Sequence, residues 1–262
     1  MGLVSSQLQH NPLFDVFQKA ILRAEIRFIS RFILQRSNEE RLTGNLVSEL
    51  DAAIFLAKPI FRQLARERYH RERDFDFFYY DLSRGGKVEK QTGADLGFVI
   101  VVDLPDHPFT VRSVVFQAKK CNSTATIDIN QLRKIQETTN NKSAYLFYDM
   151  DFRSLASPIV IDTSKLTSQA EESEKKEQKS FTLKMDEILN RGVPLSLYLL
   201  YDVIEGGQGV ECSSFDSAFH RFQEMANSNL SPEPFNGRLA IVSLGKPISI
   251  ATNLDGGLDI SI

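Results

Sequence analysis

The chain has 262 residues, of which 42% are hydrophobic and 25% charged, values that exclude a wholly disordered protein. Its 31 lysines and arginines stand against 34 aspartates and glutamates, and the net charge of −3 excludes a uniformly basic coat for nucleic acid but not a local basic groove. No stretch of 18 consecutive apolar residues is present, so we expect no transmembrane helix and no membrane partner.

The cysteines and the N-terminal segment bear on the compartment. Two cysteines, Cys121 and Cys212, cannot form a disulfide framework or a four-cysteine zinc site, so we expect a reduced, cytoplasmic setting. The first residues lack the basic and the long apolar stretch of a secretory signal. Gly2 and Ser6 fit a loose myristoylation pattern, which we take as accidental.

Two helices are predicted in the first part of the chain. Apolar residues recur with helical spacing over 13–36. A second helix is predicted to begin at Asn38, a good N-cap residue, with Glu39 and Glu40 at the positive end of the helix dipole. Pro59 is expected to break or kink this helix, because proline lacks the backbone N–H that a helix interior requires.

The segment 61–74 is rich in arginine, interleaved with acids. It is interpreted as a solvated helix face, with a phosphate-contacting surface as the alternative. Short segments rich in aromatic and β-branched residues then predict strands over 75–82, 96–104, 111–117, 143–148 and 158–161. A turn is predicted at residues 85–87, and a helix over 127–140.

The remaining third of the chain predicts further helices and short strands. Residues 167–180 are almost wholly polar, which indicates an exposed loop or a solvated helix. Helices are predicted near 183–190 and 215–226, and strands over 195–202, 238–244, 248–251 and 258–262. The order of elements predicts an α/β fold with a mixed sheet flanked by helices.

Three polar side chains are expected to converge at one edge of this sheet. Asp95 stands at the start of the strand 96–104, and Gln117 and Lys119 stand two residues apart at the end of the next strand. In an antiparallel pair, the start of the first strand lies beside the end of the second. Asp and Gln oxygens suit Mg²⁺, and a lysine can hold a water or stabilise developing negative charge. This combination suits metal-assisted phosphodiester hydrolysis.

The segment Thr92-Gly93-Ala94-Asp95 followed by Phe116-Gln117-Ala118-Lys119 resembles the signature of the PD-(D/E)XK phosphodiesterase superfamily, the restriction-endonuclease-like nucleases. In that signature, an Asp at a strand start is followed by acid-x-Lys at the end of the next strand. Gln117 departs from the acidic consensus in the manner of a known Gln-x-Lys variant, and leaves one negative charge fewer at the metal. The resemblance covers roughly residues 38 to 165.

The resemblance implies an α-β-β-β-α-β core and a Mg²⁺-dependent DNA endonuclease that leaves a 5′-phosphate, with Mn²⁺ as a substitute metal. Asp95 and Gln117 would hold the metal, and Lys119 would position the attacking water or the transition-state charge. We accordingly divide the chain into four parts. These are an N-terminal helical segment (1–37), a nuclease-like core (38–166), a polar loop or linker (167–180), and a C-terminal α/β extension (181–262) that could complete the same domain.

Several branches of the superfamily add a glutamate from the helix before the sheet. Helical phase ranks Glu39 first as catalytic residue and metal ligand, because it falls inside the apolar stripe of that helix, where an unbound carboxylate would be costly. Glu40 ranks second and Glu49 third. The alternative is that Glu39 and Glu40 only stabilise the start of the helix.

The sequence contains no NTPase motif, helix-turn-helix or zinc finger that would select a target. By analogy with the superfamily, we expect the effector subunit of a bacterial restriction or antiphage defence system, regulated by a sensor protein. Two alternatives stay open: a catalytically inactive nucleic-acid-binding or assembly subunit on the same fold, and an RNA endonuclease. Whether the chain forms a homo-oligomer is also open.

Overall fold

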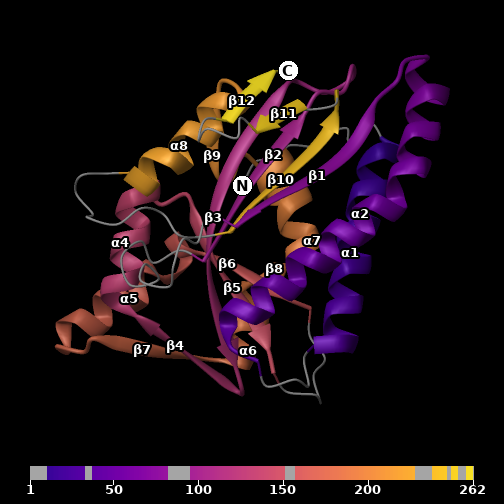
Figure 1. The fold of residues 1–262 in the computed structure, drawn as a ribbon. Coiled ribbons are helices and arrows are strands. Elements are labelled where there is room, and N and C mark those ends of the chain that lie inside the picture. The colour runs from indigo at the N-terminus through magenta and orange to yellow at the C-terminus, as the bar shows by residue number, and fades with distance from the viewer. Residues whose placement is uncertain are drawn as a thin grey trace, which may run out of the picture.

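The structure, a computed structural model, describes residues 11–32, 37–81, 95–150, 157–227, 238–246, 249–252 and 258–261. It confirms the mixed α/β architecture, in which helices cover a central sheet (Figure 1). The turn predicted at 85–87 lies outside the described residues. No helix in the described ranges is long and apolar enough to span a membrane.

The two predicted N-terminal helices are confirmed as α1 (Pro12–Phe32) and α2 (Glu39–Tyr69), which lie side by side (Figure 1). Residues 33–36, the predicted end of the first helix, lie outside the described residues. Asn38 caps α2 as expected, because its side-chain oxygen accepts a hydrogen bond from the backbone N–H of Arg41 at 2.9 Å.

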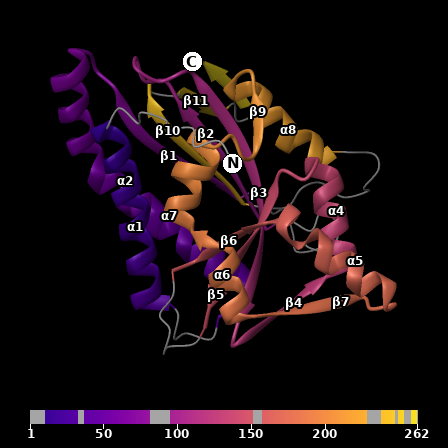
Figure 2. The ribbon, with the colours of Figure 1, turned by 180° about the vertical axis from the view of Figure 1, so that it is seen from behind.

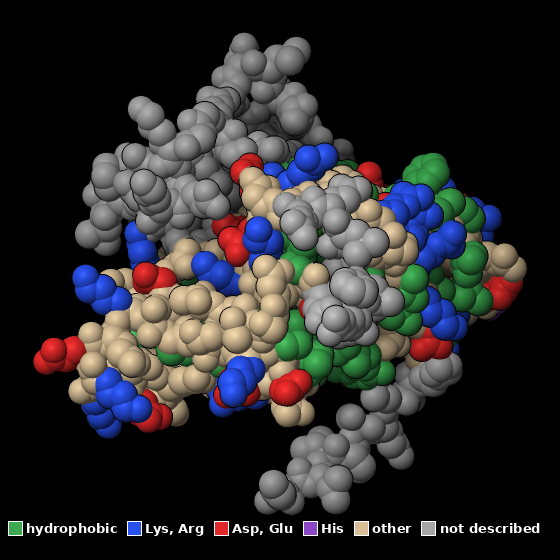
Figure 3. Space-filling model, turned by 90° about the horizontal axis from the view of Figure 1, so that it is seen from below, with side chains coloured by type: hydrophobic (Ala, Val, Ile, Leu, Met, Phe, Trp, Pro, Cys, Tyr) green, Lys and Arg blue, Asp and Glu red, His purple; other side chains and the backbone are tan. Residues whose placement is uncertain are grey.

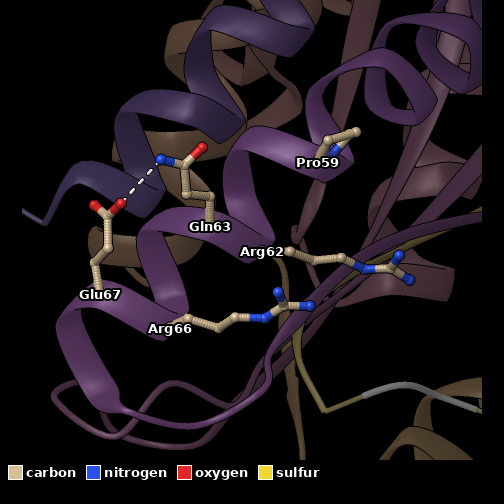
Figure 4. Close-up of a pocket in the computed structure, with 5 residues that line it drawn as sticks. All are labelled: Pro59, Arg62, Gln63, Arg66 and Glu67. Atoms are coloured by element: carbon tan, nitrogen blue, oxygen red, sulfur yellow. Dashed lines mark hydrogen bonds between the residues drawn. The ribbon is translucent and has the colours of Figure 1, made fainter.

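The structure excludes a break at Pro59, one of the two outcomes predicted there, because α2 continues through Pro59 for another ten residues to Tyr69. A proline inside a helix costs about 3 kcal/mol. Here the turns beyond it bury Phe61 and Ala65, and burying a phenylalanine side chain recovers roughly 1.5–3 kcal/mol. Pro59 itself lies on the outer face of α2, beside the side chains of Arg62 and Gln63 (Figure 4).

Two arginines of the segment 61–74 bind acids at the sheet. Arg62 forms two hydrogen bonds with Asp74, and Arg68 forms two with Asp106. These pairs tie the end of α2 to the first strand of the sheet and to the loop after the second strand.

The central sheet has eight strands. In spatial order they are β1 (Asp74–Asp81), β10 (Arg238–Gly245), β2 (Leu96–Val102), β3 (Thr110–Cys121), β5 (Ser143–Asp149), β6 (Ile159–Asp162) and β8 (Val193–Pro194), with β9 (Val210–Cys212) also paired to β3. β2 and β3 are antiparallel as predicted, and β3 and β5 are parallel. β10 inserts between β1 and β2, so a strand from the last 25 residues is an interior strand of the sheet.

Alternation along the strands divides the apolar side chains between two faces of the sheet. Even-numbered residues of β2, such as Phe98 and Ile100, pack against α1, α2 and the helical segment 195–205. Odd-numbered residues, such as Val99 and Val101, pack against α8 (Phe215–Asn227). Figures 1 and 2 show α1 and α2 on one side of the molecule and α8, α4 and α5 on the other.

The region between β3 and β6 differs from the prediction in detail. The helix predicted over 127–140 begins only at residue 129, as α4 (Ile129–Thr139). Residues before it form β4 (Thr124–Asp128), which pairs with β7 (Ser180–Lys184). This partner lies more than 50 residues away, so no local pattern revealed it.

The segment 167–180, predicted as an exposed loop or a solvated helix, is helical over its first nine residues. The remaining elements are η2 (Thr163–Leu166), α5 (Thr167–Lys175), α6 (Met185–Arg191), and the small sheet of β11 (Ser249–Thr252) with β12 (Leu258–Ser261).

The strand predicted over 195–202 is wrong, because this segment is helical: α7 (Leu195–Leu197) continues into the π-helix η3 (Tyr198–Glu205). A short apolar run does not distinguish a buried strand from a buried helix. The deciding contact is tertiary: the buried carboxylate of Glu25 accepts hydrogen bonds from the backbone N–H and the hydroxyl of Ser196, at 2.9 and 2.8 Å. These bonds satisfy donors at the start of the helix.

Glu49 holds the two N-terminal helices together. Its buried carboxylate accepts hydrogen bonds from Arg27 at 2.6 Å and Arg31 at 2.8 Å. Burial raises the pKa of Glu49, but the two arginines outweigh this effect and hold the pKa below its ordinary value. A carboxyl whose pKa is depressed in the folded state contributes stability above its unfolded-state pKa, and this contribution is lost as the pH falls through the folded-state pKa.

We therefore predict that Glu49→Gln lowers the free energy of unfolding by roughly 1–3 kcal/mol at neutral pH. The difference from the wild type should shrink in acid, where Glu49 is protonated in both states. Urea unfolding between neutral and acid pH measures both effects. The matched control is Asp51→Asn, an exposed acid on the same helix; equal losses in the two variants would contradict the prediction.

Candidate functional site

The candidate site lies where β2 begins beside the end of β3. Leu96 pairs with Phe116, and the backbone N–H of Asp95 donates to the carbonyl of Phe116 at 2.9 Å. Asp95 is therefore the residue that immediately precedes the paired part of β2. Gln117 and Lys119 follow Phe116 on β3 and face the side of the sheet that α4 covers, since both contact Gln131 of that helix.

A continuous chain of hydrogen bonds joins these side chains. Gln117 donates from Nε2 to Asp95 Oδ2 at 2.5 Å, and Gln131 donates from Nε2 to Gln117 Oε1 at 3.1 Å. Lys119 donates from Nζ to Gln131 Oε1 at 3.0 Å. The structure thus brings Asp95, Gln117 and Lys119 together at one sheet edge, with Gln131 as the link between the last two.

The direction of this chain follows from its two ends. An ammonium can only donate hydrogen bonds, and an ionised carboxylate can only accept them. Lys119 therefore takes the oxygen of Gln131, and Asp95 takes the nitrogen of Gln117. Each amide between them has its orientation set by these charged ends.

Glu39 reaches the same end of β3 from the start of α2. Its Oε1 accepts a hydrogen bond from the backbone N–H of Lys120 at 3.0 Å. Glu40 does not join the hydrogen-bonded chain, because its Oε1 lies 3.3 Å from the guanidinium of Arg238. Glu49 lies in the contact with Arg27 and Arg31 described above, away from this edge.

Arg238, the first residue of β10, connects the start of α2 to Asp95. Its side chain donates to the carbonyl of Glu40 at 2.7 Å, and its backbone N–H donates to the carbonyl of Asp95 at 3.3 Å. The sequence analysis missed Arg238, because it lies 143 residues from Asp95 and no motif connects the two.

Gln131 lies within the helix predicted over 127–140, and the sequence pattern gave it no role in the site. It stands three residues after Asp128, whose side chain accepts from the backbone N–H of Gln131 at 2.9 Å and so caps α4. The spacing Asp-x-x-Gln at a helix start was the available sequence signal. It places Gln131 in the first turn of α4, which faces the end of β3.

A buried tyrosine on β5, Tyr148, pairs with Lys120 of β3 and forms a hydrogen bond with the hydroxyl of Thr43 at 3.0 Å. Burial raises the pKa of Tyr148, and the negative charges of Asp95 and Glu39 raise it further. The hydrogen bond with Thr43 and the charge of Arg238 oppose this rise.

Asp95, Gln117 and Glu39 are the residues at this edge that could hold a divalent cation, which prefers oxygen ligands. In the described ranges no three His, Cys, Asp or Glu side chains gather as a metal-binding group. The Nε2 atom of Gln117, however, lies between two oxygens, Asp95 Oδ2 at 2.5 Å and the carbonyl of Ala118 at 3.2 Å. If the side-chain amide of Gln117 were flipped, its Oε1 would take the place of Nε2 and lie beside these two oxygens. Glu39 supplies a further carboxylate at this end of the strand.

We predict that Arg238→Met lowers the free energy of unfolding by roughly 1–2 kcal/mol, because the carbonyl and the carboxylate of Glu40 both lose a charged donor. Methionine retains most of the aliphatic stem, so the loss reports on the guanidinium. Arg41→Met, at an exposed position of α2, is the matched control and should change stability little. Unfolding curves that coincide for the two variants would contradict this role of Arg238.

The chain matches no protein-family model, no curated protein and no solved structure. The geometry and the chemistry of the site are therefore the basis for assigning a function.

Proposed function

We propose that this protein is a metal-dependent nuclease of the PD-(D/E)XK type that hydrolyses phosphodiester bonds of DNA. The observation that carries the proposal is the hydrogen-bonded chain from Asp95 through Gln117 and Gln131 to Lys119. It gathers a carboxylate, an amide oxygen and an ammonium group at one strand end, which is the chemistry that metal-assisted phosphodiester hydrolysis requires.

The order of elements supports the same proposal. The sequence α2, β1, β2, β3, α4 and β5 accords with an α-β-β-β-α-β core, apart from the short strand β4, with β2 antiparallel and β5 parallel to β3. One feature departs from the simple order, since β10 separates β1 from β2.

The proposed roles follow from the donors at the site. Asp95, Gln117 and Glu39 would hold Mg²⁺ or Mn²⁺, which supplies Lewis-acid stabilisation of charge on a phosphoryl oxygen. Lys119 would hold the attacking water or stabilise the negative charge that develops on the scissile phosphate. Glu40 has no part in this assignment, because its carboxylate is paired with Arg238.

We also propose a regulatory protein partner, as in a restriction or antiphage defence system. Five of the nine exposed large hydrophobic side chains in the described part of the chain lie on α1 and α2: Leu22, Ile26, Phe55, Leu56 and Ile60. Figure 3, which views the molecule from below, shows hydrophobic and basic side chains together on its right side. α1 and α2 lie on the same side in Figure 1. Such gathered apolar surface is typical of protein–protein contacts.

DNA cleavage tests the proposal directly. With Mg²⁺ or Mn²⁺, the wild type should cut supercoiled and linear DNA, and Asp95→Ala and Lys119→Ala should reduce the rate by about 100-fold or more, because each removes a group acting on the transition state. Lys134→Ala, at an exposed position of α4, is the control. Parallel reactions with RNA test the alternative substrate.

The wild type could cleave neither DNA nor RNA and yet bind metal, with Asp95→Ala abolishing this binding. That result would point to a missing activating partner. Absence of metal binding in the wild type would overturn the nuclease proposal.

A catalytically inactive binding or assembly subunit is the second candidate. It is favoured by the amide of Gln117, which saturates Asp95 Oδ2 without any metal, together with the N–H of Ala118 at 2.8 Å.

Gln117→Glu separates the two candidates. Gln117 is buried, so its replacement would place a second carboxylate against Asp95 and should destabilise the metal-free protein by roughly 1–3 kcal/mol. If the site binds metal, Mn²⁺ should restore the melting temperature more in this variant than in the wild type. Destabilisation that Mn²⁺ does not relieve would favour the inactive subunit.

A further inference from the structure

With Asp95 ionised and Lys119 protonated, the two amides between them form an unbroken chain of hydrogen bonds in only one direction. In the structure, each amide turns its nitrogen towards Asp95 and its oxygen towards Lys119. Reversing one amide alone would set two NH₂ groups or two carbonyl oxygens against each other, which leaves buried polar groups unpaired. Gln117 is only 3% exposed, so water has little access to satisfy it.

Metal binding at Asp95 and the hydrogen bond of Lys119 require opposite orientations of the two amides. To act as a ligand beside Asp95, Gln117 must present Oε1 where Nε2 now lies. Its Nε2 then faces Gln131, which must turn its own oxygen towards Gln117. Gln131 then offers Nε2 to Lys119 in place of Oε1, and an ammonium cannot accept a hydrogen bond.

We propose that Gln131 couples the metal site to Lys119: the ammonium is held by Gln131 while the site is empty, and is released towards substrate when Asp95 and Gln117 bind a divalent cation. This inference rests on the proposed function, since it requires a metal at Asp95 and Gln117. It makes Gln131 a positioning residue that acts through Lys119, and it makes the lysine available only when the metal is present.

The chemical reactivity of the Lys119 amine measures its release without any substrate. The full-length protein is exposed at neutral pH to a trace of an amine-acylating ester, with and without Mn²⁺, and the labelling of Lys119 is determined by mass spectrometry relative to Lys134. We expect Mn²⁺ to raise the labelling of Lys119 in the wild type by about tenfold, because a hydrogen bond to a charged group is broken.

Gln131→Met separates release from a simple effect of nearby positive charge. Methionine has a similar length but lacks the amide, so the metal-free variant should be labelled as fast as the metal-bound wild type, and Mn²⁺ should add little. Asn130→Met, at an exposed position of the same helical turn, should behave as the wild type. If Gln131→Met retains the full response to Mn²⁺, the charge of the metal alone explains the effect and the coupling is overturned.

Metal affinity gives a second readout. Because binding in the wild type must break the bond between Lys119 and Gln131, Gln131→Met should bind Mn²⁺ about tenfold more tightly by titration calorimetry. Weaker or unchanged binding would instead indicate that Gln131 only supports the fold of the site.

The outcomes distinguish this inference from the proposed function. A wild type that binds Mn²⁺ and loses it on Asp95→Asn, but whose Lys119 labelling does not respond to Mn²⁺, overturns the coupling and leaves the metal site standing. A wild type that binds no Mn²⁺ overturns both. The labelling of the wild type needs no variant to fold, so this test holds even if Gln131→Met is unstable.

Discussion

The antiparallel pairing of β2 with β3 is the contact on which the candidate site depends. Its register sets Leu96 against Phe116, and so places Asp95 beside Gln117. A shift of one residue would turn Gln117 and Lys119 to the opposite face of the sheet, among the apolar contacts of α1 and α2. β2 is buried along its whole length and packs a different set of apolar side chains on each face, so such a shift would disrupt both sets of contacts. The hydrophobic core and the polar site therefore depend on the same register.

Contacts distant in sequence complete this edge. The start of α2 brings Glu39 to the backbone of Lys120, and β10 inserts beside β2 and brings Arg238 to both Glu40 and the backbone of Asp95. The C-terminal part of the chain is therefore built into the sheet that carries the site. A change in the position of β10 would therefore also move Asp95, because the backbone N–H of Arg238 donates to the carbonyl of Asp95.

The chain of amides gives the site a property that its individual residues lack. Asp95 and Lys119 stand at opposite ends of this chain of hydrogen bonds, and the orientation of each amide depends on both. Buried polar networks of this kind have few fully satisfied states, because every reversed group leaves an unpaired partner. In the proposed nuclease, this limit on the amide orientations would couple metal binding at Asp95 to the release of Lys119 from Gln131.

The sequence by itself determined the mixed α/β class, the presence of two helices in the first part of the chain, the antiparallel strands, and the convergence of Asp95, Gln117 and Lys119. Each of these follows from local periodicity or from a single hairpin-like pairing. Only the tertiary structure decided the continuation of α2 through Pro59, the helix at Ser196 and the places of Arg238 and Gln131. The first three depend on burial against distant elements or on hydrogen bonds across more than a hundred residues, which no local pattern encodes. The place of Gln131 depends on how α4 packs against the end of β3.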